Sequence, residues 1–154
     1  PSYGPESRGG TSYADVHVAR DEVLSPAAPT PHVLVAFNPP SLKKFGPTVA
    51  DGGTILYDSA VIAECPDFGP KVRVVGLPFA DIAKELGRVM VKNVVALGAM
   101  QAATELSPSE SFLTAIRQAL ADKCAMLAIN EAAFERGRQA FLDTRPALPE
   151  PTPA

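Results

Sequence analysis

The feature that most constrains the fold is the uninterrupted apolar run Val33–Phe37, with the sequence VLVAF. A strand with one face in water alternates apolar and polar residues, whereas a strand covered on both faces of a parallel sheet is apolar throughout. Asn38-Pro39-Pro40 follows directly, and proline cannot continue a strand ladder. The run therefore predicts a buried parallel strand that ends at Asn38.

Three other segments carry strand patterns. Ala14–Val18 alternates apolar and polar residues, which is typical of a strand with one wet face, so His17 is expected to be solvated there. The runs Thr54–Tyr57, after a Gly-Gly turn, and Val72–Val75 each predict a short strand. The chain is therefore expected to contribute four strands.

The helix patterns follow these strands. We expect a helix that begins near Pro78 and stops at Gly87, and a helix over Val91–Thr104 that is buried because small and aliphatic residues surround it. Ser107-Pro108-Ser109-Glu110 has the form of a capping box, with Ser107 at the cap and Pro108 at the first helical position. A last helix face is marked by Leu127, Ala133, Phe134 and Phe141.

Strands that alternate with helices predict an α/β fold, a three-layer α/β/α domain with a mostly parallel sheet. We expect this domain to span residues 1–144 and a flexible Pro-rich tail to span 145–154. Ligands of such sheets bind beyond the carboxyl ends of the strands. This rule selects Asn38, the loop around Gly76-Leu77-Pro78 and, near the start of the next helix, Asn93. Each Asn has a structural alternative: Asn38 as an Asx turn before Pro39, and Asn93 at a helix end.

The opening ten residues, PSYGPESRGG, are too irregular for a strand or a helix. Gly9 and Gly10 allow a close backbone approach, and Arg8 offers a planar fork of donors for a phosphate or a carboxylate, with Glu6 able to orient it. The segment therefore suits contact with a ligand or partner. The alternative is an exposed loop with a surface ion pair.

Composition excludes several classes of protein. The net charge is −3 and the basic residues are scattered, so no nucleic-acid surface is expected, and no apolar run is long enough to span a membrane. We expect a soluble cytoplasmic protein. Cys65 and Cys124 are far apart and more consistent with packed or free thiols than with cluster ligands, and the isolated His17 and His32 suggest no metal site.

No catalytic constellation is visible. The serines lie in no GxSxG elbow, and the chain has neither a Walker loop nor a GxGxxG turn. Glu131 and Glu135 lie four residues apart on a predicted helix, where they favour a solvated face with Arg136 and Arg138 over a catalytic dyad. We therefore expect no catalytic residue in this chain.

Five segments carry a family resemblance in their order along the chain: PSYGPESRGG, VLVAFNPPSLKKF, GGTILYDS, VVGLPFADIAKELG and VKNVVALGAM. Together they resemble the gamma subunit, or gamma domain, of the 2-oxoacid:ferredoxin oxidoreductases, from Pro1 to about Phe141. The family's first strand and its glycine-rich turn, which precede the first motif, are not in this sequence. We therefore expect a fragment, a processed piece or a part of a larger polypeptide, N-terminally incomplete as a domain.

The resemblance implies a share in the oxidative decarboxylation of a 2-oxoacid, 2-oxoglutarate or pyruvate, to an acyl-coenzyme A. Thiamine diphosphate, Mg and iron-sulfur clusters are expected on alpha, beta and, where present, delta partner subunits, with ferredoxin as electron acceptor. The isolated chain is expected to hold no cofactor and to be inactive. Coenzyme A is expected at a shared site, held in position by Arg8, Gly9, Gly10, Asn38 and Asn93.

The same resemblance implies a partner interface in the opening segment, formed by Tyr3, Glu6 and Ser7. The competing hypothesis is a non-catalytic structural or interaction domain that docks partner subunits through residues 1–10 and binds no small molecule.

Overall fold

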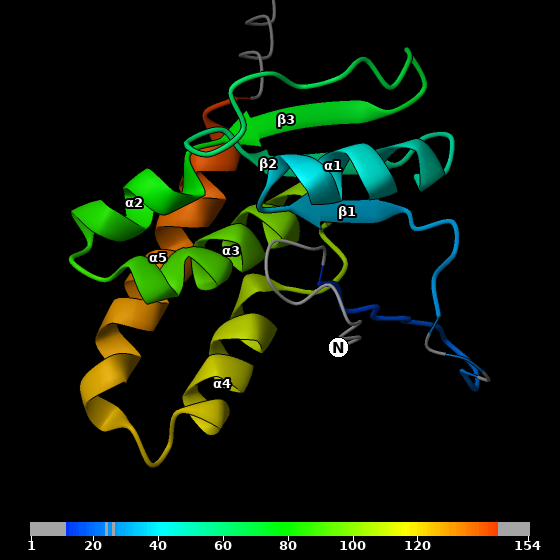
Figure 1. Cartoon of the computed structure of the whole chain (residues 1–154). Coiled ribbons are helices and arrows are strands. Elements are labelled where there is room, and N and C mark those ends of the chain that lie inside the picture. Colours follow the sequence, from blue (N-terminus) through cyan, green and yellow to red (C-terminus); the bar gives the residue numbers. More distant parts are fainter. Residues whose placement is uncertain (1–11, 24, 26, 145–154) are drawn as a thin grey trace, which may run out of the picture. The chain divides into compact units, whose positions relative to one another are not determined.

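The computed structural model describes residues 12–23, 25 and 27–144. They belong to two units that divide between Pro78 and Phe79, and each unit is described by itself (Figure 1). The opening motif and the tail at 145–154 lie outside the described residues. No helix in the described part of the chain combines the length and the apolar character that crossing a membrane requires.

The first unit contains a three-stranded sheet. Its strands are β1 (Val33–Ala36), β2 (Thr54–Asp58) and β3 (Arg73–Leu77), paired in the order β1-β2-β3 with every pairing parallel. The register aligns Val33 with Thr54 and Thr54 with Arg73. The α/β class with a parallel sheet that the apolar runs predict is therefore confirmed, and β1 lies at one edge of the described sheet.

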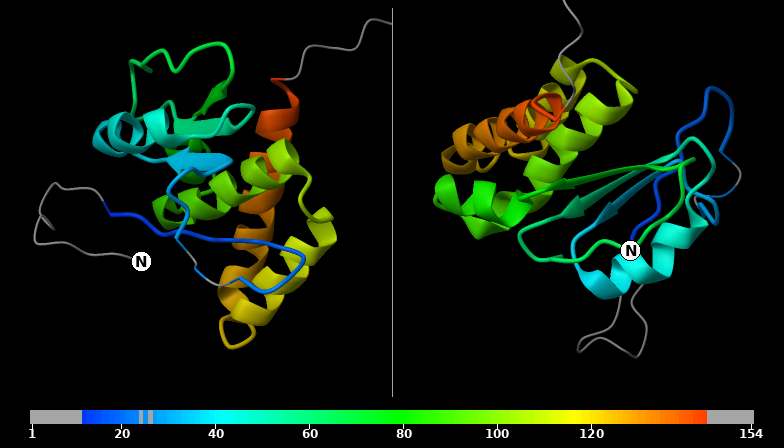
Figure 2. Two further views of the ribbon diagram at one scale, coloured as in Figure 1. Left: turned by 90° about the vertical axis from the view of Figure 1, so that its right-hand side faces the viewer. Right: turned by 90° about the horizontal axis from the view of Figure 1, so that it is seen from above.

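Helix α1 (Pro39–Phe45) follows β1 and runs into the short 3₁₀ helix η1 (Gly46–Thr48). Asn38 is the N-cap, and proline at the first helical positions costs nothing because those backbone N–H groups have no intrahelical acceptor. Figure 2 shows α1 running alongside the three strands. The core of this unit is formed by Ala36, Leu42, Val49, Ile55 and Ile62.

β3 extends two residues further than its sequence pattern indicates. Gly76 and Leu77, expected in a loop, pair with Tyr57 and Asp58 of β2. A Cβ on Gly76 would lie 2.5 Å from the Tyr57 ring, so glycine here makes room for that aromatic side chain. A glycine in a sequence often indicates the end of a strand. Gly76 instead lies within β3, because the Tyr57 side chain on the neighbouring strand leaves no room for a Cβ.

The prediction of a strand at Ala14–Val18 is wrong. No strand is assigned to these residues, and the side chains of Val16 and Val18 are 80% and 62% exposed. His17 is solvated as expected, with its Nδ1 3.0 Å from the Ser25 carbonyl oxygen. Alternation indicates which face a strand would bury, but a strand forms only where a neighbouring strand completes its ladder.

The second unit begins with α2 (Phe79–Glu85), the 3₁₀ turn η2 (Val89–Val91) and α3 (Lys92–Thr104). Gly87, with a positive φ of 85°, ends α2 as expected. The N–H of Gly87 donates to the Lys84 carbonyl and the N–H of Arg88 donates to the Ala83 carbonyl, which is the Schellman pattern. A side chain other than glycine would be strained at this φ.

Helices α4 (Ser109–Ala119) and α5 (Cys124–Leu142) complete the second unit. The predicted capping box, with Ser107 at the cap, is wrong by one residue. Pro108 is the N-cap of α4, and no side-chain hydrogen bond caps the helix. The Ser107 carbonyl instead accepts a hydrogen bond from the Gln101 side chain at 3.0 Å, which fixes the loop before α4.

α3 and α5 pack so closely that each backbone touches the other. A Cβ built on Gly98 of α3 would lie 1.9 Å from the Phe134 carbonyl oxygen, and one on Gly137 of α5 would lie 1.8 Å from the Val95 carbonyl oxygen. The two glycines therefore form a reciprocal contact that no larger residue permits. Val95, Ala99 and Phe134 are fully buried, which confirms the buried helix expected over this region.

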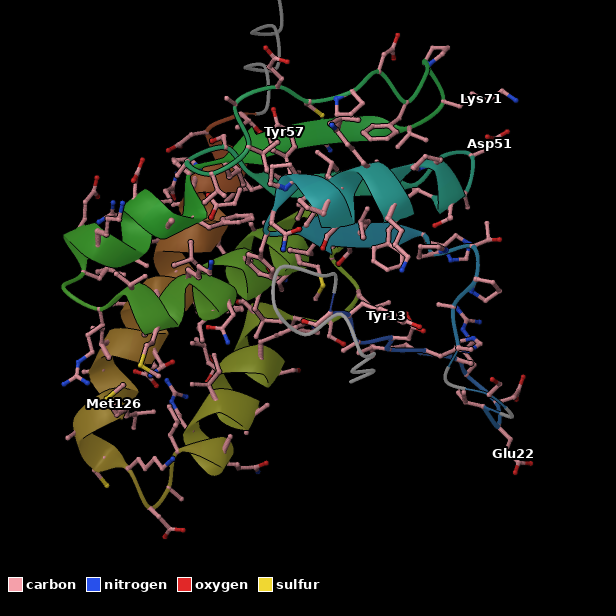
Figure 3. The ribbon with its side chains drawn as sticks, in the orientation of Figure 1. Tyr13, Glu22, Asp51, Tyr57, Lys71 and Met126 are labelled. Carbon is pink, nitrogen blue, oxygen red and sulfur yellow. The ribbon has the colours of Figure 1, made fainter. Side chains whose placement is uncertain are left out.

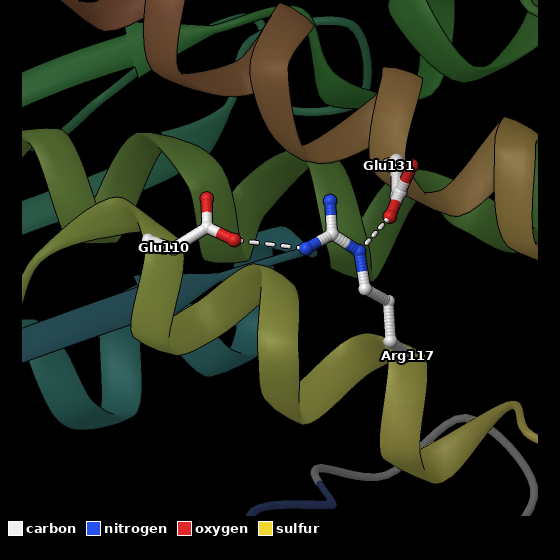
Figure 4. Close-up of polar contacts among 3 residues, drawn as sticks. All are labelled: Glu110, Arg117 and Glu131. Carbon is white, nitrogen blue, oxygen red and sulfur yellow. Dashed lines mark hydrogen bonds and ion pairs between the residues drawn. The ribbon is translucent and has the colours of Figure 1, made fainter.

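Arg117 of α4 joins its helix to α5. Its Nη1 donates to the Glu110 carboxylate at 2.8 Å, and its Nε donates to the Glu131 carboxylate at 2.5 Å (Figure 4). The hydrogen bond to Glu131 is the main cause that raises the pKa of Arg117, followed by that to Glu110. Glu131 therefore forms an ion pair, but with Arg117 of another helix and not with the expected Arg136 or Arg138.

Two side-chain contacts of the first unit bear on its surface chemistry. Asp51 and Lys71 form an exposed ion pair at 2.8 Å (Figure 3). Tyr57 and Cys65 are joined by a side-chain hydrogen bond. Burial raises the pKa of the Cys65 thiol, and a hydrogen bond with Tyr57 lowers it by less. Burial is also the main cause that raises the pKa of Tyr57. Both cysteines are free, and Cys124 is exposed.

We predict that iodoacetamide alkylates Cys124 before Cys65 in the native chain at pH 8. The thiolate is the reacting form, and a raised pKa leaves less of it at a given pH, while partial burial limits access to Cys65. Peptide mass spectrometry after short exposures measures the order, with the unfolded chain as the control in which the difference should vanish. Equal labelling of both thiols in the native chain would contradict the prediction.

Candidate ligand site at the carboxyl edge of the sheet

The carboxyl ends of the three parallel strands meet at one edge of the first unit. Asn38 lies just after β1, Asp58 is the last residue of β2, and Pro78 follows β3. The N–H of Ser59 donates to the Leu77 carbonyl at 3.0 Å, so the ends of β2 and β3 are held together. This edge is where a ligand of a parallel sheet is expected.

Asn38 performs the structural role that its position before Pro39 allows. Its Oδ1 accepts a hydrogen bond of 2.9 Å from the Ser41 N–H and so caps α1. Its Nδ2 makes no hydrogen bond with the described residues. The cap therefore uses one end of the amide and fixes its direction, and it leaves two N–H donors for a ligand.

Asp58 is a residue of this edge that the sequence analysis missed. It is fully buried, and its Oδ1 accepts a hydrogen bond of 3.1 Å from the Ala60 N–H. Its carbonyl oxygen accepts from the N–H groups of Val61 and Ile62. The carboxylate thus shapes the turn that leaves β2. The available signal was an acidic residue directly after the apolar run TILY, at the expected end of a strand.

Asn93 lies in the second unit, at the second residue of α3. Its side chain is exposed and makes no hydrogen bond with the described residues, and the N-cap position is Val91. The structural alternative for Asn93, a side chain that satisfies the helix end, is therefore not observed. Its amide retains its full set of donors and acceptors.

The structure thus places Asn38 at the carboxyl edge and Asn93 on the surface of the other unit, each within its own unit. Arg8, Gly9 and Gly10, together with Tyr3, Glu6 and Ser7, lie outside the described residues. The chemistry that the described part offers is hydrogen bonding by amides, suited to holding a polar ligand in position.

The parallel sheet and the helices that follow its strands define an α/β domain. The model of the pyruvate ferredoxin/flavodoxin oxidoreductase family matches residues 1–140, and the chain belongs to this family. It is 44% identical over 141 residues to the ketoisovalerate oxidoreductase subunit VorA of Methanothermobacter thermautotrophicus, covering 90% of this chain and 29% of that protein. It is 33% identical over 118 residues to the 2-oxoglutarate synthase subunit KorC of Methanocaldococcus jannaschii, covering 75% of this chain and 62% of that protein.

Solved structures support the same family. The gamma subunit of a keto/oxoacid ferredoxin oxidoreductase from Geobacter sulfurreducens superposes with a TM-score of 0.73 at 26% identity, covering 93% of this chain and 78% of that one. A 2-oxoglutarate:ferredoxin oxidoreductase from Magnetococcus marinus, with 2-oxoglutarate, coenzyme A and succinyl-CoA bound, gives a TM-score of 0.68 at 25% identity. This match covers 77% of this chain and 21% of the Magnetococcus marinus chain. The gamma-type resemblance in the sequence is thus confirmed.

Proposed function

We propose that this chain is the gamma-type part of a 2-oxoacid:ferredoxin oxidoreductase and helps to hold coenzyme A while the active site closes. The observation that carries the proposal is the match of residues 1–140 to the oxidoreductase family, together with the similarity to an enzyme whose solved structure has coenzyme A and succinyl-CoA bound. The amide donors that Asn38 and Asn93 do not share with any described residue fit such a role, because coenzyme A offers phosphate and amide acceptors.

Each proposed residue acts by positioning rather than by proton transfer. Arg8 supplies a charge-assisted fork to a phosphate, and glycine at positions 9 and 10 has no Cβ that would keep the same kind of ligand from the backbone N–H groups. Asn38 directs its Nδ2 from the cap of α1. Holding the coenzyme in the orientation of attack lowers the entropic part of the barrier.

The rest of the catalytic machinery belongs, in this proposal, to alpha, beta and, where present, delta partner subunits or domains. Thiamine diphosphate, Mg and iron-sulfur clusters are assigned there, and ferredoxin accepts the electrons from the assembled complex. The chain spans less than a third of the VorA relative, which is consistent with one part of a larger assembly. Identity favours a branched-chain 2-oxoacid as substrate, since the VorA relative is 44% identical and the KorC relative 33%.

We predict that Arg8→Lys in the assembled oxidoreductase weakens the use of coenzyme A by about 1–3 kcal/mol in kcat/KM, because lysine keeps the charge but loses the planar fork. Asn93→Ala should weaken it by about 1 kcal/mol, the typical value of one neutral hydrogen bond. Saturation kinetics with coenzyme A measure both effects.

The decarboxylation half-reaction, which needs the 2-oxoacid but no coenzyme A, is the internal control and should be unchanged. Lys123→Ala serves as the matched surface variant, because Lys123 is exposed and outside the proposed site. Loss of assembly with Arg8→Lys, at unchanged coenzyme A kinetics in whatever complex remains, would favour the alternative of a docking domain. Unchanged kinetics and unchanged assembly would remove Arg8 from the site altogether.

A further inference from the structure

A pocket of about 390 Å³ lies within the second unit, at the opposite end of α3 from Asn93. It opens between the end of α3, the loop before α4 and the last two turns of α5. Its polar wall contains Gln101, Glu105 and Arg138, and its apolar wall contains Ala102, Leu106 and Leu142. This volume falls in the range of small-molecule sites, which hold a few placed polar groups in a mainly apolar wall.

A chain of hydrogen bonds fixes the guanidinium of Arg138 in this wall. Gln101 is only 5% exposed, and its side chain donates from Nε2 to the Ser107 carbonyl at 3.0 Å. Its Oε1 accepts from Arg138 Nε at 2.7 Å, and Arg138 Nη1 donates to the Glu135 carboxylate at 3.0 Å. A buried amide that holds an arginine from one side orients the arginine before any ligand arrives.

The described residues engage only two of the five N–H donors of the guanidinium. Arginine has five N–H donors, and Arg138 uses one on Nε and one on Nη1 with described residues, so Nη2 makes none. The side chain is 27% exposed, enough to be reached from the pocket and sheltered enough to limit screening. These donors have the geometry that a carboxylate accepts.

The other residues that line the pocket limit the charge and the size of a ligand that it can bind. Glu105 lines the pocket and Glu135 contacts Arg138, so a second negative charge on a ligand would be repelled, which disfavours phosphates and dicarboxylates. Leu106, Leu142 and Ala102 offer an aliphatic surface opposite the charge, and Leu106 is 58% exposed. A short aliphatic monocarboxylate can pair its one negative charge with Arg138 and pack its hydrocarbon against the aliphatic wall.

We propose that this Arg138 pocket binds a short branched or linear aliphatic monocarboxylate, with its carboxylate on Arg138 and its hydrocarbon on Leu106 and Leu142. The site is independent of the proposed coenzyme A role, so either can fail without the other. A pocket of this size and a ligand of few atoms correspond to a Kd on the order of millimolar.

The test uses the full chain and two probes of the same shape, 3-methylbutanoate and its neutral amide, 3-methylbutanamide. Titration is followed by the NMR signal of the Arg138 Nε–H. We expect saturable shifts with the carboxylate and at least tenfold weaker binding of the amide. Equal binding of the two probes, or a static Arg138 signal up to roughly 50 mM, well above the expected Kd, would overturn the proposal.

Three variants test which residues determine the binding of 3-methylbutanoate. Arg138→Gln should weaken 3-methylbutanoate binding at least tenfold, whereas Arg136→Gln, two residues earlier and paired with Glu85, should leave it unchanged. Glu105→Gln should tighten it about twofold to threefold, because a negative charge leaves the pocket wall. Circular dichroism checks folding, and Arg138→Lys replaces Arg138→Gln if that variant unfolds. Binding that ignores Arg138 and Glu105 would contradict the site.

Discussion

Gly137→Ala should destabilise the second unit by about 3 kcal/mol. A Cβ at this position would lie 1.8 Å from the Val95 carbonyl oxygen, so α3 and α5 must move apart and open their shared core. Intrinsic helix propensity predicts the opposite sign, a gain of about 1 kcal/mol for alanine over glycine in a helix interior. Chemical denaturation followed by far-UV circular dichroism measures the change.

Ala128→Gly, at an exposed position of the same helix, is the matched control and should cost about 1 kcal/mol by propensity alone. Gly98→Ala should behave like Gly137→Ala, because its Cβ would lie 1.9 Å from the Phe134 carbonyl oxygen. A gain in stability with Gly137→Ala would show that the close helix contact does not exist in solution.

Leu42→Ala should destabilise the first unit by about 3 kcal/mol. Leu42 is fully buried on α1 and belongs to the same core cluster as Ala36 and Ile55, so the truncation removes apolar contact and leaves a cavity beside the sheet. Hydrogen exchange of the β1 and β2 amides reports the opening free energy of this unit directly.

Lys43→Ala, the exposed neighbour on α1, is the control and should change that opening free energy by less than about 0.5 kcal/mol. Amides of α3 and α5 provide a second comparison within the same sample. Unchanged protection of β1 and β2 in Leu42→Ala would mean that α1 does not pack on the sheet as described.

The candidate site was predictable only in part. The end of an apolar strand and the rule for parallel sheets locate Asn38 from sequence, but they cannot show that its Oδ1 caps α1 while its Nδ2 contacts no described acceptor. Asp58 was missed because an acid after a strand is ordinary in sequence, and its full burial depends on residues from elsewhere in the fold. Arg138 is also ordinary in sequence, since the side chain that orients it, Gln101, is 37 positions away.

The sequence by itself determined the α/β class, the three described strands and the helix stop at Gly87, because these depend on local pattern: apolar runs, prolines that end strands, and a glycine that accepts positive φ. Tertiary structure alone decided that Ala14–Val18 stays unpaired and that Gly76 lies inside a strand. It also decided that Gly98 and Gly137 bring two helices into backbone contact. For the three glycines the deciding atom belongs to a residue distant in sequence, and for Ala14–Val18 the deciding factor is that no described strand pairs with it. Local propensity carries no information about either.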